Sequence, residues 1–410
     1  MSKSENILIN GPINVVRLEG TVSNIKKVIY VFMDYHEKIE YQTKCPSFSS
    51  LDLYQYLAIN LKNIAQPVDF MFEITESYLG ESSYEYKDIY IREVVELFKS
   101  QYSVKNKTIQ SPISNLVRYH YIDVRDYIFN TINYYDHMLK EILENLNCTD
   151  YIAKTLNDDL KYYLGQIIFE LNYWDVLLFG DLKLISQKTT QNLKRLQKDK
   201  QIDQKEINND IKAVPKFIHK IREKYKNPQI KNNLQNIFNF IKNTLIQNKE
   251  LCFDIINEMD KYKDNVVDFN QLHYSKCSAS YNWGQSLCDN IDTVKSIIKK
   301  YMLLSHKILN MFSDVMDIFF LRRFLDKDYI KHAIVYTGCA HSINYIQHLI
   351  TKYNFKVTHV SYSKNNNIDD LNKHLKKFDS TDDRREYQKM FYPPKLIQCS
   401  NLSSFPKNFN

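Results

Sequence analysis

The 410-residue sequence is poor in the residues that build tight turns. It contains only 7 Gly and 9 Pro, which argues against a many-stranded sandwich and favours long helices. It also lacks any run approaching ~18 apolar residues, and its first residues, MSKSENILINGPINVV, contain no apolar signal-peptide core. We therefore expect neither a membrane span nor secretion, and we place the protein in the cytoplasm.

Cysteine is present without metal-binding spacing. None of the seven cysteines belongs to a C-x-x-C pair, and their number is odd. This pattern argues against a zinc site built on cysteine and predicts reduced thiols in a cytosolic setting. The cysteines are Cys45, Cys148, Cys252, Cys277, Cys288, Cys339 and Cys399.

Charge of one sign does not dominate the sequence. The net charge is +7, and Lys and Arg are mixed with Asp and Glu along most of the chain, which is typical of a solvated surface and argues against nucleic-acid binding. Hydrophobic residues make up 44%, which predicts a packed core. The abundance of Asn, Lys, Ile and Tyr is typical of an AT-rich genome, such as that of a large DNA virus or a protist.

Strands and helices are predicted to alternate over the first part of the chain. Short apolar runs rich in β-branched and aromatic residues indicate strands, and apolar stripes at helical spacing indicate helices. The strands are expected at 28–33, 68–74 and 118–124, and the helices at 50–66, at 88–102 and from about Asp126.

Helical periodicity then dominates residues 150–325. A polar stretch within it, 186–212, predicts an exposed helix hairpin or a mobile loop. Strand character returns at 333–336 and 355–363, and the polar tail after residue 364 is expected to cover the surface.

This order predicts an α/β fold with a mostly parallel central sheet, flanked by helices, and a large all-helical insertion. Residues 1–149 and 311–410 would form the α/β domain, and residues 150–310 the insertion.

Each of the first four predicted strands ends in, or is directly followed by, a polar or turn-forming group. In a parallel sheet these carboxyl ends meet at one edge, where ligands bind. The groups are Asp34 and His36, then Glu73, then Asp123, Arg125 and Asp126, and finally Gly338 and His341. Imidazoles and carboxylates at one edge predict a divalent-metal site for Mn, Co or Zn. Its expected ligands are His36, His341, Glu73 and Asp34.

Each of these residues also has a structural interpretation. A strand-end Asp often caps a helix or forms a turn. His341 could begin the helix that follows it, and Arg125 could pair with Asp123 or Glu73. His120 lies inside a predicted strand and is expected to pack in the core.

Three short motifs carry a family resemblance: MDYH at 33–36, Glu73, and GCAH at 338–341 after AIVYT. In this order they resemble the erythromycin esterase/ChaN-like and TraB/TIKI superfamily, whose members have an early G-x-x-H or G-E-x-H motif, a strand ending in Glu, and a later G-x-x-H. HYIDVRD also resembles a D-x-R strand of relatives from large DNA viruses. The resemblance implies a TIKI/ChaN-type fold with His36, Glu73 and His341 lining one cleft.

Two residues depart from that pattern. Met33 replaces a glycine, and a side chain is unfavourable where the backbone must approach closely. Cys339 occupies a position that is often polar. Its thiol could be a soft ligand or nucleophile, or a small buried filler.

The leading hypothesis is a metal-dependent hydrolase with an esterase- or peptidase-type cleft for a small molecule or peptide. Its catalytic residues would be Glu73, His36, His341 and Arg125, and Asp123, Asp126 and Gly338 would bind substrate. The first alternative is a catalytically inactive structural or interaction protein of the host cytoplasm or virus particle, with 150–310 as its partner surface. A third, less favoured hypothesis is nucleic-acid binding through Lys- and Tyr-rich faces.

Overall fold

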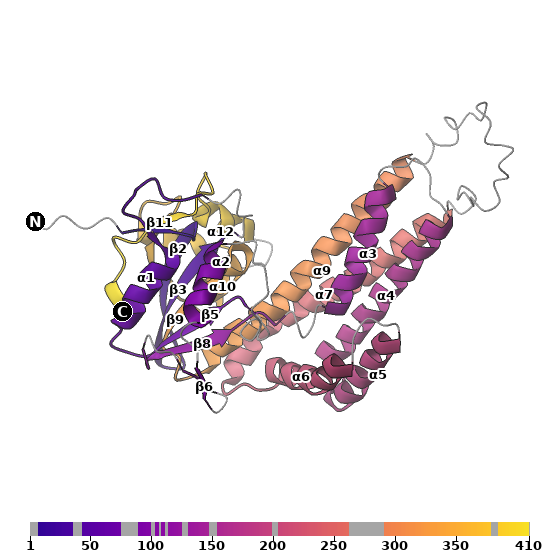
Figure 1. Cartoon of the computed structure of the whole chain (residues 1–410), viewed down its shortest axis with the longest axis horizontal. Coiled ribbons are helices and arrows are strands. Elements are labelled where there is room, and N and C mark those ends of the chain that lie inside the picture. Colours follow the sequence, from indigo (N-terminus) through magenta and orange to yellow (C-terminus); the bar gives the residue numbers. More distant parts are fainter. Residues whose placement is uncertain are drawn as a thin grey trace, which may run out of the picture. The chain divides into compact units, whose positions relative to one another are not determined.

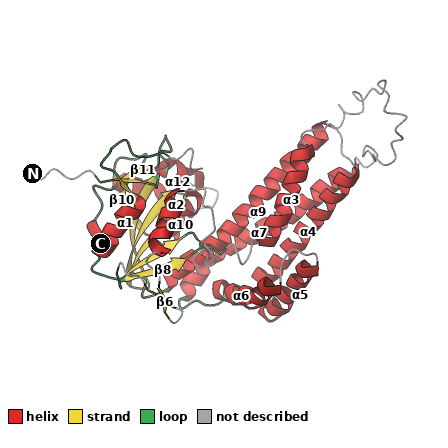
Figure 2. Cartoon of the chain, in the orientation of Figure 1, coloured by secondary structure: helices red, strands yellow, loops and turns green. Residues whose placement is uncertain are grey.

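The computed structural model describes residues 7–35, 43–74, 89–99, 103–105, 108–110, 114–124, 130–146, 154–198, 204–261, 291–378 and 384–409. Helices flank a central sheet, so the predicted α/β class with a helical insertion is confirmed (Figures 1 and 2). The chain divides into two compact units. An α/β unit comprises Met1–Val124, Tyr225–Asn233 and Phe319–Asn410, and a helical unit comprises Arg125–Lys224 and Leu234–Ile318.

The central sheet is mixed, with the order β10-β2-β3-β9-β5-β8. The four strands β3, β9, β5 and β8 are parallel neighbours. Only β2 runs in the opposite direction: it pairs antiparallel with both β3 and the edge strand β10. The strands are β2 (Asn14–Val22), β3 (Ile25–Asp34), β5 (Val68–Phe72), β8 (Val117–Tyr121), β9 (His332–Gly338) and β10 (Lys356–Val360).

The five strands predicted from apolar runs correspond to β3, β5, β8, β9 and β10. Strand β2 was not predicted, because Arg17 and Glu19 interrupt its apolar pattern. It forms a hairpin with β3 through a two-residue turn, in which Ser23 and Asn24 have positive φ values of 51° and 62°. Both values match the turn that best fits the twist of a hairpin, although the usual glycine is missing.

A small second sheet has the order β11-β1-β4 and contains β1 (Leu8–Asn10), β4 (Leu51–Asp52) and β11 (Cys399–Asn401). A disulfide joins Cys45 to Cys399, so the prediction that all cysteines are reduced is wrong. The two residues are 354 positions apart, and local spacing contains no signal of their pairing.

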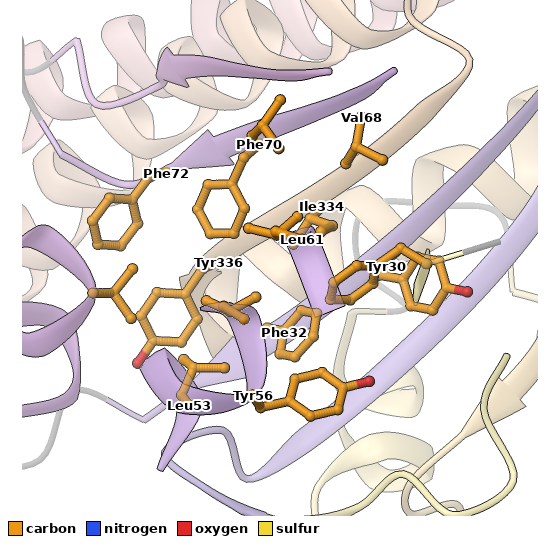
Figure 3. Close-up of a cluster of buried hydrophobic side chains, with 14 of the residues drawn as sticks. Tyr30, Phe32, Leu53, Tyr56, Leu61, Val68, Phe70, Phe72, Ile334 and Tyr336 are labelled. Carbon is orange, nitrogen blue, oxygen red and sulfur yellow. The ribbon is translucent and has the colours of Figure 1, made fainter. Parts of the chain in front are cut away.

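One face of the central sheet packs on α1 (Leu53–Lys62) and α2 (Ile89–Lys99). Figure 3 shows part of this core, in which alternate strand residues such as Phe32 and Tyr336 lie near Leu53 and Tyr56 of α1. The tail also enters this core: the Phe409 ring lies 5.2 Å from Tyr30 and 5.9 Å from Tyr56, centroid to centroid. The expectation that the tail only covers the surface is therefore wrong. It also forms α11 (Ile368–Leu375), α12 (Arg384–Phe391) and β11.

The opposite face of the sheet packs on α10 (Cys339–Tyr353), which contacts β2, β3 and β9. Its residues Ile343, Ile346 and Ile350 are buried. Coverage on both faces explains why the central strands are continuous apolar runs.

The helical unit is built from long helices. They are α3 (Asn130–Leu146), α4 (Lys154–Phe179), α5 (Ile185–Lys198), α6 (Gln204–Arg222) and most of α7 (Pro228–Lys261) and α9 (Ile291–Asp326). The polar stretch 186–212 lies in α5 and the beginning of α6, apart from residues 199–203, which are outside the described residues. No helix in the part of the chain that the structure describes is long and apolar enough to cross a membrane.

Candidate functional site

The carboxyl ends of β3, β9, β5 and β8 lie along one edge of the central sheet, because these strands are parallel neighbours. Asp34 is directly opposite Gly338 in the register of β3 and β9. Phe72 pairs with Tyr336, and the next residue, Glu73, donates its backbone N–H to the Tyr336 carbonyl at 3.2 Å. The edge therefore brings together residues that the sequence placed on three separate strands.

The Glu73 carboxylate binds the beginning of α10. Its Oε2 accepts hydrogen bonds from the Thr337 hydroxyl at 2.7 Å and from the Gly338 N–H at 2.6 Å. Gly338 is the N-cap of α10 and has no capping side chain of its own. A carboxylate from the neighbouring strand thus satisfies an N–H at a helix N-terminus, where negative charge is favourable.

His341 stands beside the same carboxylate. The G-x-x-H spacing puts His341 in the first turn of α10, and its Nε2 lies 3.7 Å from Glu73 Oε1. Both side chains are almost completely buried, with 8% and 6% exposure. The imidazole stacks on Tyr345, which stacks on Phe320 with a centroid distance of 4.0 Å. The position of the ring is therefore fixed by packing as well as by charge.

Asp34 and Cys339 lie next to this pair at the sheet edge. Asp34 is fully buried, and Cys339 is buried at the first position of α10. Burial raises the pKa of the Cys339 thiol well above its usual value, and the nearby negative charge of Asp34 raises it further, whereas a hydrogen bond with Tyr392 lowers it. At neutral pH the group is a thiol rather than a thiolate, which fits a small buried filler better than a nucleophile or soft ligand.

The remaining predicted site residues divide into two groups. Asp123 is buried just after β8, and its N–H donates to the Ile74 carbonyl at 3.3 Å. His36, Arg125 and Asp126 lie outside the described residues, so their roles stay predictions.

The expected metal site has two of its four ligands side by side. Glu73 and His341 are close together, Asp34 lies at the same edge of the sheet, and His36 is outside the described residues. Within the described ranges, no group of three or more His, Cys, Asp and Glu side chains is arranged to hold a metal ion. The pair could supply two ligands, and a tetrahedral site with one open position usually needs three.

Three residues at the edge were not predicted: Thr337, Tyr345 and Tyr392. Thr337 had a usable signal, since it is a hydroxyl residue at the end of an apolar strand. Tyr345 is indistinguishable in the sequence from an ordinary core residue of an amphipathic helix. Tyr392 follows α12 in a segment predicted to be a surface tail, and only the fold brings it to Cys339.

A second, partly buried polar cluster lies between β5 and β8. Arg118 donates to both carboxylate oxygens of Asp69, at 2.8 and 2.6 Å, and His120 Nε2 lies 2.7 Å from Asp69 Oδ1. Burial would raise the pKa of Asp69, but hydrogen bonds from Arg118 and His120 outweigh it and lower the pKa. We interpret the cluster as a cross-link between strands, because Asp69 lies on β5 whereas Arg118 and His120 lie on β8. Arg118 also donates to the Tyr329 carbonyl.

Comparison with known proteins gives a family. The model of DUF5847, described as a family of unknown function, matches residues 7–410. Three proteins of Acanthamoeba polyphaga mimivirus, each named as uncharacterised, are 32%, 32% and 31% identical to this chain. Each alignment covers 98% of this chain and 97–98% of the relative. No solved structure matches.

These matches correct the resemblance drawn from short motifs. The family model over nearly the whole chain is DUF5847, so the assignment to the erythromycin esterase/ChaN-like and TraB/TIKI superfamily is wrong. Motifs of four residues at strand ends are too short to distinguish common ancestry from the general need for polar groups at that edge.

Proposed function

Since the chain belongs to DUF5847, a family of unknown function, we propose an activity from its own geometry: Glu73 and His341 form the acid–base pair of a hydrolase that acts on a small molecule or peptide. The observation that carries the proposal is the buried contact between Glu73 Oε1 and His341 Nε2 at the carboxyl edge of parallel strands. Ligands of open α/β sheets bind at this edge.

The arrangement supports a simple division of roles. Glu73 would orient the imidazole and stabilise its protonated form, while the other ring nitrogen, Nδ1, would take a proton from an attacking water. The Glu73 carboxylate can contact His341 through Oε1 while its position is fixed by the hydrogen bonds that Oε2 accepts from Thr337 and Gly338. In the metal-dependent form of the proposal, His36 and Asp34 would join the pair as ligands of Mn, Co or Zn.

One observation favours the second candidate, a catalytically inactive interaction protein. Glu73 already has a structural task as the cap of α10, which explains a buried carboxylate without any substrate. Such a protein would act in the host cytoplasm or in the virus particle, and the mimivirus origin of the relatives supports that setting.

Conservative variants separate the two candidates. Glu73→Gln keeps an oxygen that can accept from Thr337 and Gly338, so we expect the melting temperature to fall by only a few degrees. His341→Gln likewise removes the base and keeps a polar side chain. If the pair is catalytic, each variant should lose about 100-fold or more of the hydrolysis rate measured on a panel of ester and peptide substrates.

The matched control is His359→Gln, since His359 is a partly buried histidine of β10, a strand that contains none of the candidate site residues. It should hydrolyse at the wild-type rate. Metal content is measured on the same preparations, with His36→Ala and His341→Ala expected to reduce any bound Mn, Co or Zn. Wild-type protein that is inactive with and without these metals, or that Glu73→Gln leaves equally active, would favour the interaction protein.

A further inference from the structure

The positive charge of the chain is concentrated in one helical hairpin. Residues 181–224 contain twelve Lys and Arg against six Asp and Glu, a net charge of +6, whereas the whole chain carries +7. The mixing of charges that argued against a polyanion partner therefore describes the rest of the chain but not this segment. The hairpin consists of α5 and α6, which pack against each other in the helical unit (Figure 1).

The hairpin turns its apolar side chains inward and its lysines outward. Buried residues on α6, such as Val214, Phe217 and Ile221, recur at helical spacing. Lys212 and Lys216 are exposed on the opposite face of the same helix, one turn apart, which is about 6 Å along the axis.

Several lysines of the hairpin are exposed to solvent. Five of them are Lys183, Lys188, Lys194, Lys212 and Lys216, and none of these forms an ion pair with a residue whose side chain the structure describes. Two described acids in this part of the helical unit have structural contacts of their own. Asp181 accepts from the Lys183 backbone N–H at 2.9 Å, and Glu170 is buried beneath Arg195. Among the side chains that the structure describes here, exposed basic groups therefore outnumber exposed acidic groups.

Exposed aromatic rings lie on the helix that α5 packs against. On α4, Phe169 is 45% exposed and Tyr162 is 51% exposed, and they are seven residues apart on one face. The Arg195 guanidinium lies 4.0 Å above the Phe169 ring centroid. Proteins that bind single-stranded nucleic acids combine basic groups, which contact the phosphates, with exposed aromatic rings, on which the bases stack.

From this surface we propose that the α5–α6 hairpin binds the phosphodiester backbone of single-stranded nucleic acid without sequence preference. An anionic membrane fits less well, because a helix that lies in a membrane must present an apolar face, and α5 and α6 bury theirs. An acidic protein fits less well, because protein interfaces usually have an apolar centre. This function is independent of the hydrolase proposed for the α/β unit.

The test measures fluorescence anisotropy of a labelled 30-nucleotide single-stranded DNA titrated with the full-length protein at several salt concentrations. Binding should be tight at low salt and should weaken linearly on a log–log plot, with a slope of about −0.7 for each phosphate contact. The variant Lys188→Gln, Lys194→Gln, Lys212→Gln, Lys216→Gln should bind at least 10-fold more weakly and lose about 3 units of slope.

Two controls keep the result specific. Changing Lys356, Lys376, Lys377 and Lys395 to Gln removes the same charge from exposed positions of the α/β unit and should leave the affinity within 2-fold. Changing the four hairpin lysines to Arg should retain binding. The proposal is overturned if both Gln variants bind alike, or if polyglutamate or phosphatidylserine vesicles bind as tightly as DNA.

Discussion

Among single residues, His120 shows how burial sets a dependence on pH. Burial lowers the pKa of His120, while its hydrogen bond to Asp69 raises it less than burial lowers it. Below pH 6.5 the unfolded chain binds a proton that the folded chain does not, so the free energy of unfolding falls as the pH falls. The slope approaches at most about 1.4 kcal/mol per pH unit.

His120→Gln removes this titration and keeps a side chain that can reach Asp69. Its stability relative to wild type should therefore increase as the pH falls from 7 to 5, measured by urea denaturation at each pH. The comparison is with wild type because burial also lowers the pKa of His332 and His359, with the same sign. A stability difference that is constant over this range would contradict the prediction.

Lys27 is a buried cation that holds the end of a helix. Its Nζ donates to the carbonyls of Phe324, Lys327 and Ile330 at 2.9, 2.9 and 2.6 Å, just where α9 ends. A cation at a helix C-terminus satisfies carbonyls that lack partners within the helix. Burial nevertheless lowers the pKa of Lys27 to about 8.

Lys27→Met should cost about 3 kcal/mol of unfolding free energy at pH 7, because it leaves these carbonyls buried without a donor. The pH dependence has a definite sign. Between about pH 8 and 10.5 the unfolded chain binds a proton that folded Lys27 does not, so wild type should gain stability over the variant as the pH rises. Chemical denaturation at pH 7, 8 and 9.5 measures this, and a decreasing difference would disprove it.

The sequence predicted only those residues of the candidate site that lie at the ends of recognisable strands. Asp34, Glu73 and His341 were found because a polar residue after a continuous apolar strand is unusual and because parallel strands end at one edge. Tyr392 was missed because its contact with Cys339 depends on where α12 packs, and no local pattern encodes this.

Among the elements, the small sheet shows where the sequence patterns failed. Strands β1, β4 and β11 contain only two or three residues each, too few for an alternating pattern. The sheet also joins segments from the two ends of the chain, through the pairing of Asn10 with Cys399. The long parallel strands were predicted because they are buried on both faces and are therefore continuously apolar.

The disulfide between Cys45 and Cys399 should stabilise this small sheet. Replacing both residues with Ser should lower the free energy of unfolding by about 2–4 kcal/mol, since the bond closes a very long loop. Hydrogen bonds between Thr43 and Gln398, at 2.9 and 3.0 Å, hold the same two segments, so the native fold should persist.

The measurement is urea denaturation with and without a thiol reductant. Wild type should lose stability in reductant, whereas the double Ser variant should not respond. A thiol assay first verifies that the reductant has broken the disulfide. If the free energy of unfolding of wild type is then unchanged, the disulfide does not contribute to stability.

In the whole molecule, the boundaries of the two units differ from the domain boundaries expected from the sequence. The helical unit begins at residue 125, whereas the prediction began it at 150, and the chain returns to the α/β unit at Tyr225–Asn233. Helices α7 and α9 pass through the boundary without interruption. A boundary inside a continuous helix leaves no linker-like composition for a sequence pattern to detect.

The two units should unfold as separate transitions, because each buries its own core and its own ion pair. Asp69 with Arg118 belongs to the α/β unit, and Glu170 with Arg195 belongs to the helical unit. Both carboxylates are fully buried, so Asp69→Ala and Glu170→Ala are matched changes. Each removes the acidic partner of a partly exposed arginine, at a cost of about 1.5–3 kcal/mol.

In scanning calorimetry, Asp69→Ala should lower only the transition of the α/β unit, and Glu170→Ala only that of the helical unit. Hydrogen exchange read by mass spectrometry assigns each transition to its residues. The helices α7 and α9 contribute residues to both units, so they could couple the unfolding of one unit to that of the other. If they transmit unfolding from one unit to the other, both variants will shift one common transition, and the chain then unfolds as a single cooperative body.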